Sequence, residues 1–194
     1  MKKLIATFAL SAVAFSAWAA PETYSIDAAH SFANFSIRHV VSKTSGTFND
    51  VSGQVVIDRD DLSKSSVQTK IKVISINTGF AQRDEHLRTK PEYLEPAKFA
   101  EITFVSSKVE STGKDSGVVT GQFTLHGVTR EIALPFKLLG FGADPWGGQR
   151  GGFEAHTMLH AADYGFGWAS NPNGPVGTDI EVTLLIEGVK EKSK

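Results

Sequence analysis

Residues 67–104, VQTKIKVISINTGFAQRDEHLRTKPEYLEPAKFAEITF, contain the pattern that decides the fold. The beginning alternates as a half-buried strand does, with one face formed by Val67, Thr69, Ile71 and Val73. The next run, AQRDEHLRT (81–89), consists of good helix formers, and Pro91 stops it. A second alternating run begins at AEITF (100–104). The stretch therefore predicts two strands separated by a short helical insertion near residues 80–95, which serves as a lid rather than as a core helix.

Similar alternation recurs along the rest of the chain, in short runs joined by Gly, Asn and Asp turns that are typical of antiparallel hairpins. Residues 31–40, 132–138, 153–159 and 180–186 are clear examples. No internal repeat and no long linker divides the runs. We therefore predict an all-β fold, an up-and-down antiparallel barrel of about eight strands, which removes exposed edges by closing. A two-sheet sandwich is the alternative, because periodicity alone does not show closure.

The first residues are typical of a secretory signal peptide: Lys2 and Lys3, an uncharged run, then the small residues Ala17 and Ala19. We expect cleavage after Ala19, which leaves residues 20–194 as one domain in the periplasm. An uncleaved anchor is the alternative, although the apolar run is shorter than the ~20 residues that a membrane span needs.

Composition narrows the function classes. The chain has no cysteine, so disulfides, thiolate metal sites and a cysteine nucleophile are excluded. Its 20 Lys and Arg and 21 Asp and Glu are too evenly balanced to indicate nucleic-acid binding or a polybasic membrane patch.

The predicted inward faces are apolar. An eight-stranded barrel has an interior just wide enough for one small or slender ligand. Each buried CH₂ contributes about 0.8 kcal/mol, against an association cost on the order of 4 to 15 kcal/mol, so a long hydrocarbon chain can bind without polar contacts. We expect the following residues either to fill a core or to line a site for a lipid tail: Phe35, Ile37, Phe48, Val55, Ile57, Ile71, Val73, Ile102, Phe104, Phe123, Leu125, Ile132, Leu134, Phe136, Phe153, Leu184 and Ile186.

The charged insertion supplies candidates for a polar head group. Arg83, His86 and Arg88 are close enough in sequence to converge on a carboxylate or phosphate, and planar guanidinium groups suit such contacts. The alternative is a solvated helix face, in which Asp84 and Glu85 neutralise the cations.

Two other functions remain open. His156, Met158 and His160 alternate on one strand face, and imidazole and thioether ligands favour copper; exposed strand residues are the alternative. An enzyme would use His and Asp groups at the barrel mouth, but the chain has no GxSxG, phosphate-loop or HExxH motif. His30, near Asp27 and Ser31, is interpreted as a structural turn residue.

Five stretches together carry a resemblance to a known family: IDAAHSFANFSIRHV (26–40), GTFNDVSGQVVID (46–58), the insertion with its flanks (76–104), GQFTLHGVTREIALP (121–135) and RGGFEAHTMLHAADYGFG (150–167). With these motifs, essentially the whole mature chain resembles the YceI-like polyisoprenoid-binding proteins. The resemblance implies a lipocalin-like β-barrel, a periplasmic or secreted location, and a long isoprenoid chain held inside, with no settled enzymatic activity.

The sequence and the resemblance together predict a periplasmic binding protein, not an enzyme, that transports, stores or sequesters a long-chain isoprenoid lipid of polyprenyl or quinone type. We expect no cofactor, no nucleic-acid partner and no stable membrane insertion, and a homodimer is one option for its assembly. The alternatives are a copper-handling protein, an enzyme acting on an isoprenoid or lipid, and a stress-related interaction protein whose ligand is incidental.

Overall fold

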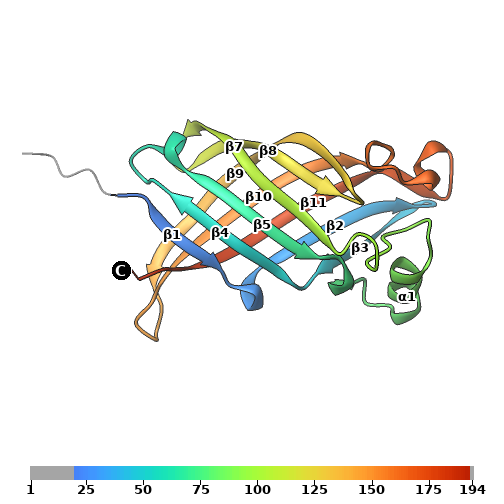
Figure 1. Ribbon diagram of the computed structural model, residues 1–194, viewed down its shortest axis with the longest axis horizontal. Coiled ribbons are helices and arrows are strands. Elements are labelled where there is room, and N and C mark those ends of the chain that lie inside the picture. Colours follow the sequence, from blue (N-terminus) through green and yellow to red (C-terminus); the bar gives the residue numbers. More distant parts are fainter. Residues whose placement is uncertain (1–19, 193–194) are drawn as a thin grey trace, which may run out of the picture.

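The computed structural model describes residues 20–192, so the predicted signal peptide, residues 1–19, lies outside the described residues. One sheet contains eleven strands: β1 (Glu22–Ile26), β2 (Phe32–His39), β3 (Ser42–Phe48), β4 (Val51–Ile57), β5 (Ser66–Lys72), β6 (Ile76–Asn77), β7 (Glu101–Gly113), β8 (Ser116–Leu125), β9 (Val128–Ala143), β10 (Gln149–His160) and β11 (Val176–Lys190). The α-helix of the described chain is α1 (Ala81–Thr89). Figure 1 shows the strands wrapping into an elongated barrel with α1 at one end.

Three pairs of strands behave as single long strands with an interruption. β11 pairs with β2 over one part of its length and with β1 over the other. In the same way β3 pairs with β2, and β4 pairs with β1. Merging β1 with β2, β3 with β4, and β5 with β6 leaves eight antiparallel strands in sequence order, closed by the β1–β11 pair. The predicted eight-stranded up-and-down barrel is therefore confirmed, and the sandwich alternative is excluded.

Two of the three interruptions lie where a short 3-10 helix bends the chain. η1 (Ala28–His30) separates β1 from β2, and η3 (Val73–Ser75) separates β5 from β6. At η1 the Asp27 side chain accepts a hydrogen bond from the Ala29 N–H, 3.0 Å away, as an N-cap residue does. These bends curve the long strands around the interior without breaking the closed sheet.

The predicted helical insertion is confirmed, and it lies at one mouth of the barrel. The helix ends before Pro91, whose missing N–H and fixed φ disfavour continuation. Asp84, in the first turn of the helix, is buried and accepts hydrogen bonds from the N–H and the hydroxyl of Thr78, at 2.8 and 2.6 Å. The loop between β10 and β11, which carries η4 (Ala161–Tyr164) and η5 (Gly167–Ser170), lies at the same end (Figure 1).

The opposite end is closed by packed aromatic rings. Tyr24 is 0% exposed, and its ring centroid lies 5.6 Å from that of Phe141 and 6.1 Å from that of Phe153. Arg59 lies over Phe141 and donates a hydrogen bond of 2.7 Å to the Tyr24 hydroxyl. Burial alone would raise the pKa of Glu22, but bonds from Lys190, Tyr24 and Arg59 hold that pKa below its usual value. We call this the closed end.

Candidate functional site

A cavity of about 640 Å³ runs through the barrel. At one end its lining includes residues of the insertion, such as Phe80 and Arg83, and at the other it reaches Ile57 and Ser65, beside the closed end. Alternation explains the lining, because every second side chain of a strand points to the same face of the sheet, and in a closed barrel one face is the interior. The volume lies within the range of about 300–1,000 Å³ that is common for small-molecule sites.

Nearly every predicted ligand residue lies at this cavity. The strands contribute Phe35, Ile37, Phe48, Val55, Ile57, Ile71, Ile102, Phe104, Phe123, Leu125, Ile132, Leu134, Phe136, Phe153, Leu184 and Ile186, and α1 contributes Arg83 and His86. The two that lie elsewhere are Val73 and Arg88. Val73 begins η3, where the period of two has ended, and it is buried in the surrounding core. Arg88 donates hydrogen bonds to the carbonyl oxygens of Ile74 and Ile76, and so anchors α1 to β6.

Most of the ionisable groups in the lining of the described residues lie at the mouth. The Arg83 guanidinium donates bonds of 2.7 Å from Nε to the Thr78 hydroxyl and from Nη2 to the Thr78 carbonyl oxygen. Because these partners are neutral, its positive charge is not neutralised by a directly bonded carboxylate among the described residues. His86, on the same helix, is exposed and also lines the cavity. The structure therefore brings Arg83 and His86 to the mouth and separates Arg88 from them.

Sequence reasoning missed the contribution of the β10–β11 loop. Phe166 and Trp168 from this loop line the cavity at its mouth. The Phe166 ring stacks on His126, with centroids 4.6 Å apart. The Trp168 Nε1–H is buried and has no hydrogen-bond partner within the described part of the chain. An irregular loop has no period, so the available signal was its density of aromatic residues among glycines, in YGFGW (164–168).

The lining offers little for acid–base chemistry. Among the described residues its ionisable members are His39, Arg83, His86 and Tyr93, all near the mouth, and Glu154. The Glu154 carboxylate lies 2.6 Å from Nε2 of His156, an exposed residue. The enzyme alternative predicts a polar patch inside the barrel, and the polar side chains of the lining away from the mouth, such as Ser65, Thr69 and Thr157, are uncharged apart from Glu154.

The copper candidates do not converge on a common point. Nδ1 of His156 lies 3.1 Å from the Thr183 hydroxyl oxygen, while its Nε2 contacts Glu154. His160, at the end of the same strand, lies 2.7 Å from an Asp179 carboxylate oxygen. Met158 is exposed between them. Each imidazole thus has its own carboxylate partner, Glu154 for His156 and Asp179 for His160.

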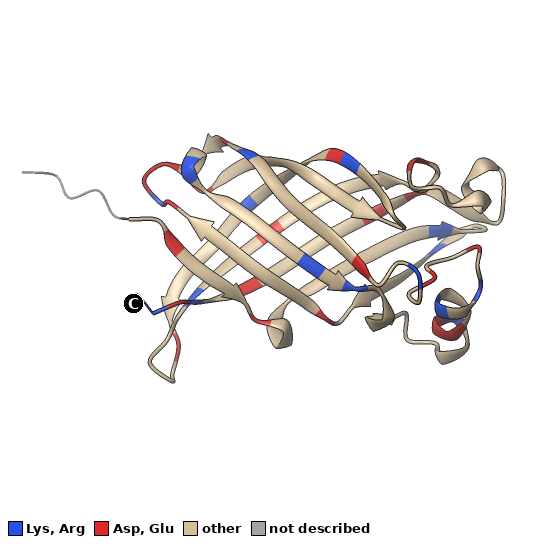
Figure 2. Ribbon diagram, viewed as in Figure 1, with Lys and Arg blue, Asp and Glu red and all other residues tan. Residues whose placement is uncertain are grey.

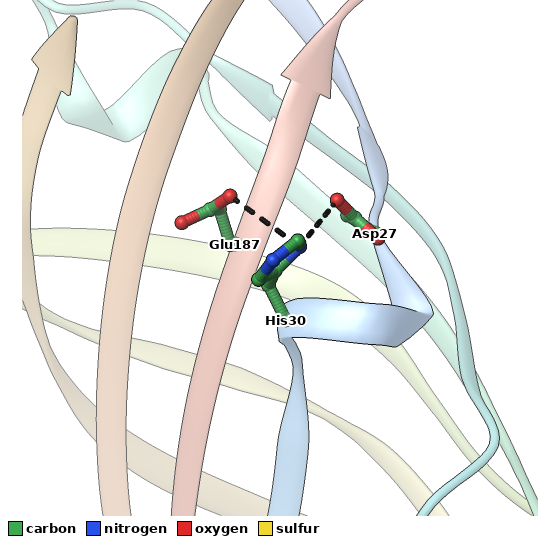
Figure 3. Close-up of side chains that lie close together, drawn as sticks. All are labelled: Asp27, His30 and Glu187. Carbon is green, nitrogen blue, oxygen red and sulfur yellow. Dashed lines mark hydrogen bonds and ion pairs between the residues drawn. The ribbon is translucent and has the colours of Figure 1, made fainter. Parts of the chain in front are cut away.

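A separate cluster of ligand-type side chains lies outside the barrel, at the η1 bend. Figure 3 shows His30 between Asp27 and Glu187, with its Nδ1 2.9 Å from the Asp27 carboxylate. Arg150 donates from one nitrogen to both Asp27 and Glu187, so a guanidinium already supplies the positive charge between them. The Ser31 hydroxyl is bonded to the main chain of Glu187. The cluster therefore fastens η1 to β10 and β11, in agreement with the structural interpretation of His30.

No helix among residues 20–192 is both long and apolar enough to cross a lipid bilayer.

Solved structures share this barrel. Burkholderia cenocepacia BcnA matches with a TM-score of 0.75 and 21% identity, over 84% of this chain and 98% of that protein. The Campylobacter jejuni YceI protein matches with a TM-score of 0.70 and 25% identity, over 79% and 88%. A domain from Saccharophagus degradans, described as a polyisoprenoid-binding domain implicated in plant cell wall breakdown, matches with a TM-score of 0.64 and 22% identity, over 87% and 98%.

Relatives in sequence cover the chain almost completely. A UPF0312 protein of Shewanella sp. (strain MR-7) is 39% identical over 97% of this chain and 96% of its own length. Protein YceI of Salmonella newport (strain SL254) is 38% identical over 99% of this chain and 100% of its own length. The family model of the YceI-like domain matches residues 24–188. The chain therefore belongs to the YceI-like family, as its motifs indicate.

Proposed function

We propose that the barrel holds one long-chain isoprenoid lipid, of polyprenyl or quinone type, with its tail along the cavity and its polar end at the mouth. The observation that carries this proposal is the shape and chemistry of the cavity, an elongated and mainly apolar interior whose ionisable groups among the described residues, apart from Glu154, lie at one end. A hydrocarbon tail gains about 0.8 kcal/mol for each buried CH₂. An amphiphile matches both parts of the site.

The two ends of the barrel give the ligand a direction. At the closed end the rings of Tyr24, Phe141 and Phe153 pack together, and the polar side chains that the lining has there, Ser65 and Ser66, carry no charge. At the mouth the side chains of Arg83 and His86 line the cavity and offer hydrogen-bond donors, and Arg83 also offers positive charge. We therefore place a phosphate or a quinone oxygen at the mouth and the distal tail beside Phe153.

The comparisons support lipid binding as the class of function. The Saccharophagus degradans domain with this fold is described as polyisoprenoid-binding. Because it is 22% identical, the likeness concerns the fold. The argument for a lipid ligand therefore depends on the cavity of this chain. The signal-type residues 1–19 support a periplasmic location after cleavage. We propose binding for transport, storage or sequestration, rather than catalysis.

A pair of matched substitutions tests the proposal. Ala155 lines the cavity, whereas Ala133 is exposed on the outer face of β9. Ala155→Phe places a ring inside the cavity, and Ala133→Phe places the same ring outside. In titrations with octaprenol, followed by intrinsic fluorescence, we expect Ala155→Phe to weaken binding at least about tenfold and Ala133→Phe to leave it unchanged.

Thermal melts of both variants verify that each barrel folds. Equal octaprenol affinity in the two variants would place the ligand outside the cavity. A wild-type protein that binds neither octaprenol nor octaprenyl phosphate would refute the proposed function.

A further inference from the structure

The turn between β2 and β3 presents two valines to solvent at the mouth. Val40 is 52% exposed and Val41 is 97% exposed. Val40 also has a φ of 52°, a conformation that β-branched side chains rarely adopt. When the first residue of a two-residue hairpin turn has positive φ, glycine is strongly preferred there. The chain thus keeps an exposed apolar pair where a Gly-Asn turn would suit the backbone better, and departures of this kind are concentrated at functional positions.

Phe80 is a second departure at the same mouth. It occupies the N-cap position of α1 and makes no side-chain cap hydrogen bond. Ser, Thr, Asp or Asn is preferred at this position because a side-chain oxygen can accept from the first N–H groups of the helix. Phe80 is instead 55% exposed, and it also belongs to the cavity lining. Its ring therefore connects the apolar interior with the outer surface.

The hairpin tip is held firmly in place. The Val40 N–H donates to the Pro175 carbonyl oxygen at 2.6 Å. The Arg38 guanidinium donates to the carbonyl oxygens of Val40, Pro172 and Gly174 at 3.0 to 3.2 Å, which joins the tip to the β10–β11 loop. Figure 1 shows this tip projecting at the same end as α1. Both apolar features are thus presented around one opening.

These features suit a lipid surface better than a protein surface. A stable protein interface needs about 800 Å² on each partner, and three separated side chains provide much less. A fluid lipid layer adapts to isolated protruding groups, and insertion brings the opening of the cavity against the membrane. Charge does not account for the contact, because Figure 2 shows both signs on α1.

We infer that the mouth docks reversibly on a lipid bilayer by inserting Val40, Val41 and Phe80, so that the ligand passes between bilayer and cavity without crossing water. The inference rests on the proposed function, since docking at the mouth serves a cavity that takes up lipid. Val40 and Val41 lie outside the cavity lining, which allows docking and ligand binding to be measured separately.

The test compares Val40→Gly/Val41→Asn with the wild-type protein and with Trp146→Ser. Trp146 is 79% exposed in the loop between β9 and β10, at the closed end, and is the matched control. Co-sedimentation uses phosphatidylcholine vesicles with and without phosphatidylglycerol. We expect the double variant to lose about tenfold in vesicle binding, Trp146→Ser to keep it, and all three proteins to bind octaprenol equally without vesicles.

The outcomes separate the two proposals. Suppose that the wild type binds octaprenol. If it then does not bind vesicles, or if the double variant binds vesicles as well as the wild type does, the docking inference is overturned and the proposed function stays intact. A wild-type protein that binds neither octaprenol nor octaprenyl phosphate overturns the proposed function. Vesicle binding that requires phosphatidylglycerol and vanishes at high salt overturns the apolar contact. A wild-type dimer that the double variant dissociates would make the tip a contact between copies, and the docking inference would fall.

Discussion

Arg83 and Arg88 carry the same side chain at the same end of the barrel, but their partners give them different roles. Arg83 bonds to Thr78 and lies in the lining of the cavity. Arg88 donates to two carbonyl oxygens, those of Ile74 and Ile76, outside the lining. A guanidinium that already satisfies main-chain carbonyls is bound to the fold, whereas one beside an open cavity can also meet a ligand.

Substitution of Arg83 is expected to discriminate between ligands by charge. Arg83→Met removes the positive charge but keeps much of the apolar stem, so it should weaken octaprenyl phosphate about tenfold or more and change octaprenol little. Fluorescence titrations with the two lipids measure the difference. Equal losses for both lipids would show that Arg83 acts on the shape of the mouth rather than on a charged head group.

Arg88→Met is the counterpart. Two hydrogen bonds from a charged donor are lost, and we expect the free energy of unfolding to fall by about 2 kcal/mol, with octaprenyl phosphate affinity unchanged. Urea denaturation measures the stability, and the titration above measures the affinity. An unchanged unfolding midpoint would mean that Arg88 does not anchor α1.

Asp27 links stability to pH. Hydrogen bonds from Arg150 and His30 lower the pKa of Asp27 from 3.8 to about 2. Because the folded-state pKa is depressed, this contribution is fully present above the unfolded-state value near 4 and is lost as pH falls towards 2. The difference in pKa corresponds to about 2 kcal/mol. Asp27→Asn should therefore be destabilised by roughly that amount at neutral pH, as measured by urea denaturation.

The control for Asp27 is the pH dependence itself. The stability gap between wild type and Asp27→Asn should narrow between about pH 4 and pH 2, even though other carboxylates titrate in both proteins. A gap that stays constant through this range would assign the loss to packing at η1 rather than to the charge of Asp27.

At the scale of elements, strand faces follow from the sequence because period two is a strong local signal. The inward set of β10, Phe153, Ala155, Thr157 and Leu159, lies at the cavity in full. The prediction extended too far at Val73, because the strand ends at Lys72 and a 3-10 turn follows. Alternation indicates which face of the sheet a side chain lies on, but it does not indicate where a strand bends.

The mouth was only partly predictable. The insertion was found because it breaks the strand period, and α1 lies within the predicted range. Phe166 and Trp168 were not assigned to the site, because their approach depends on contacts between distant segments, such as the Phe166 ring on His126. The pairing of Arg83 with Thr78 and of Arg88 with carbonyl oxygens is also set by the tertiary fold, which residue spacing does not encode.

The β10–β11 loop provides a spectroscopic test of its place at the mouth. Trp168 lines the cavity, whereas Trp146 is exposed near the closed end. Octaprenol should shift tryptophan emission to shorter wavelength in the wild type and in Trp146→Phe, because an apolar ligand displaces water from Trp168. Trp168→Phe should lose the shift. A shift that persists in Trp168→Phe and disappears in Trp146→Phe would place the ligand away from the mouth.

At the scale of the whole molecule, closure of the sheet creates the site. The β1–β11 pair completes a barrel that leaves no unpaired long edge among its eight merged strands, and the chain has no cysteine to brace it. Part of the interior is cavity rather than packed core, so the empty barrel forgoes some of the dispersion contacts that a filled interior would give. A bound lipid tail restores these contacts, and tight binding raises stability by mass action.

The most direct measurement is organic extraction and mass spectrometry of the mature protein, purified without detergent from the compartment in which it resides. The account predicts a long-chain isoprenoid at about one molecule per barrel, strongly reduced in Ala155→Phe and retained in Ala133→Phe. A purified protein that carries no amphiphile and takes up neither octaprenol nor octaprenyl phosphate when these are added would contradict it.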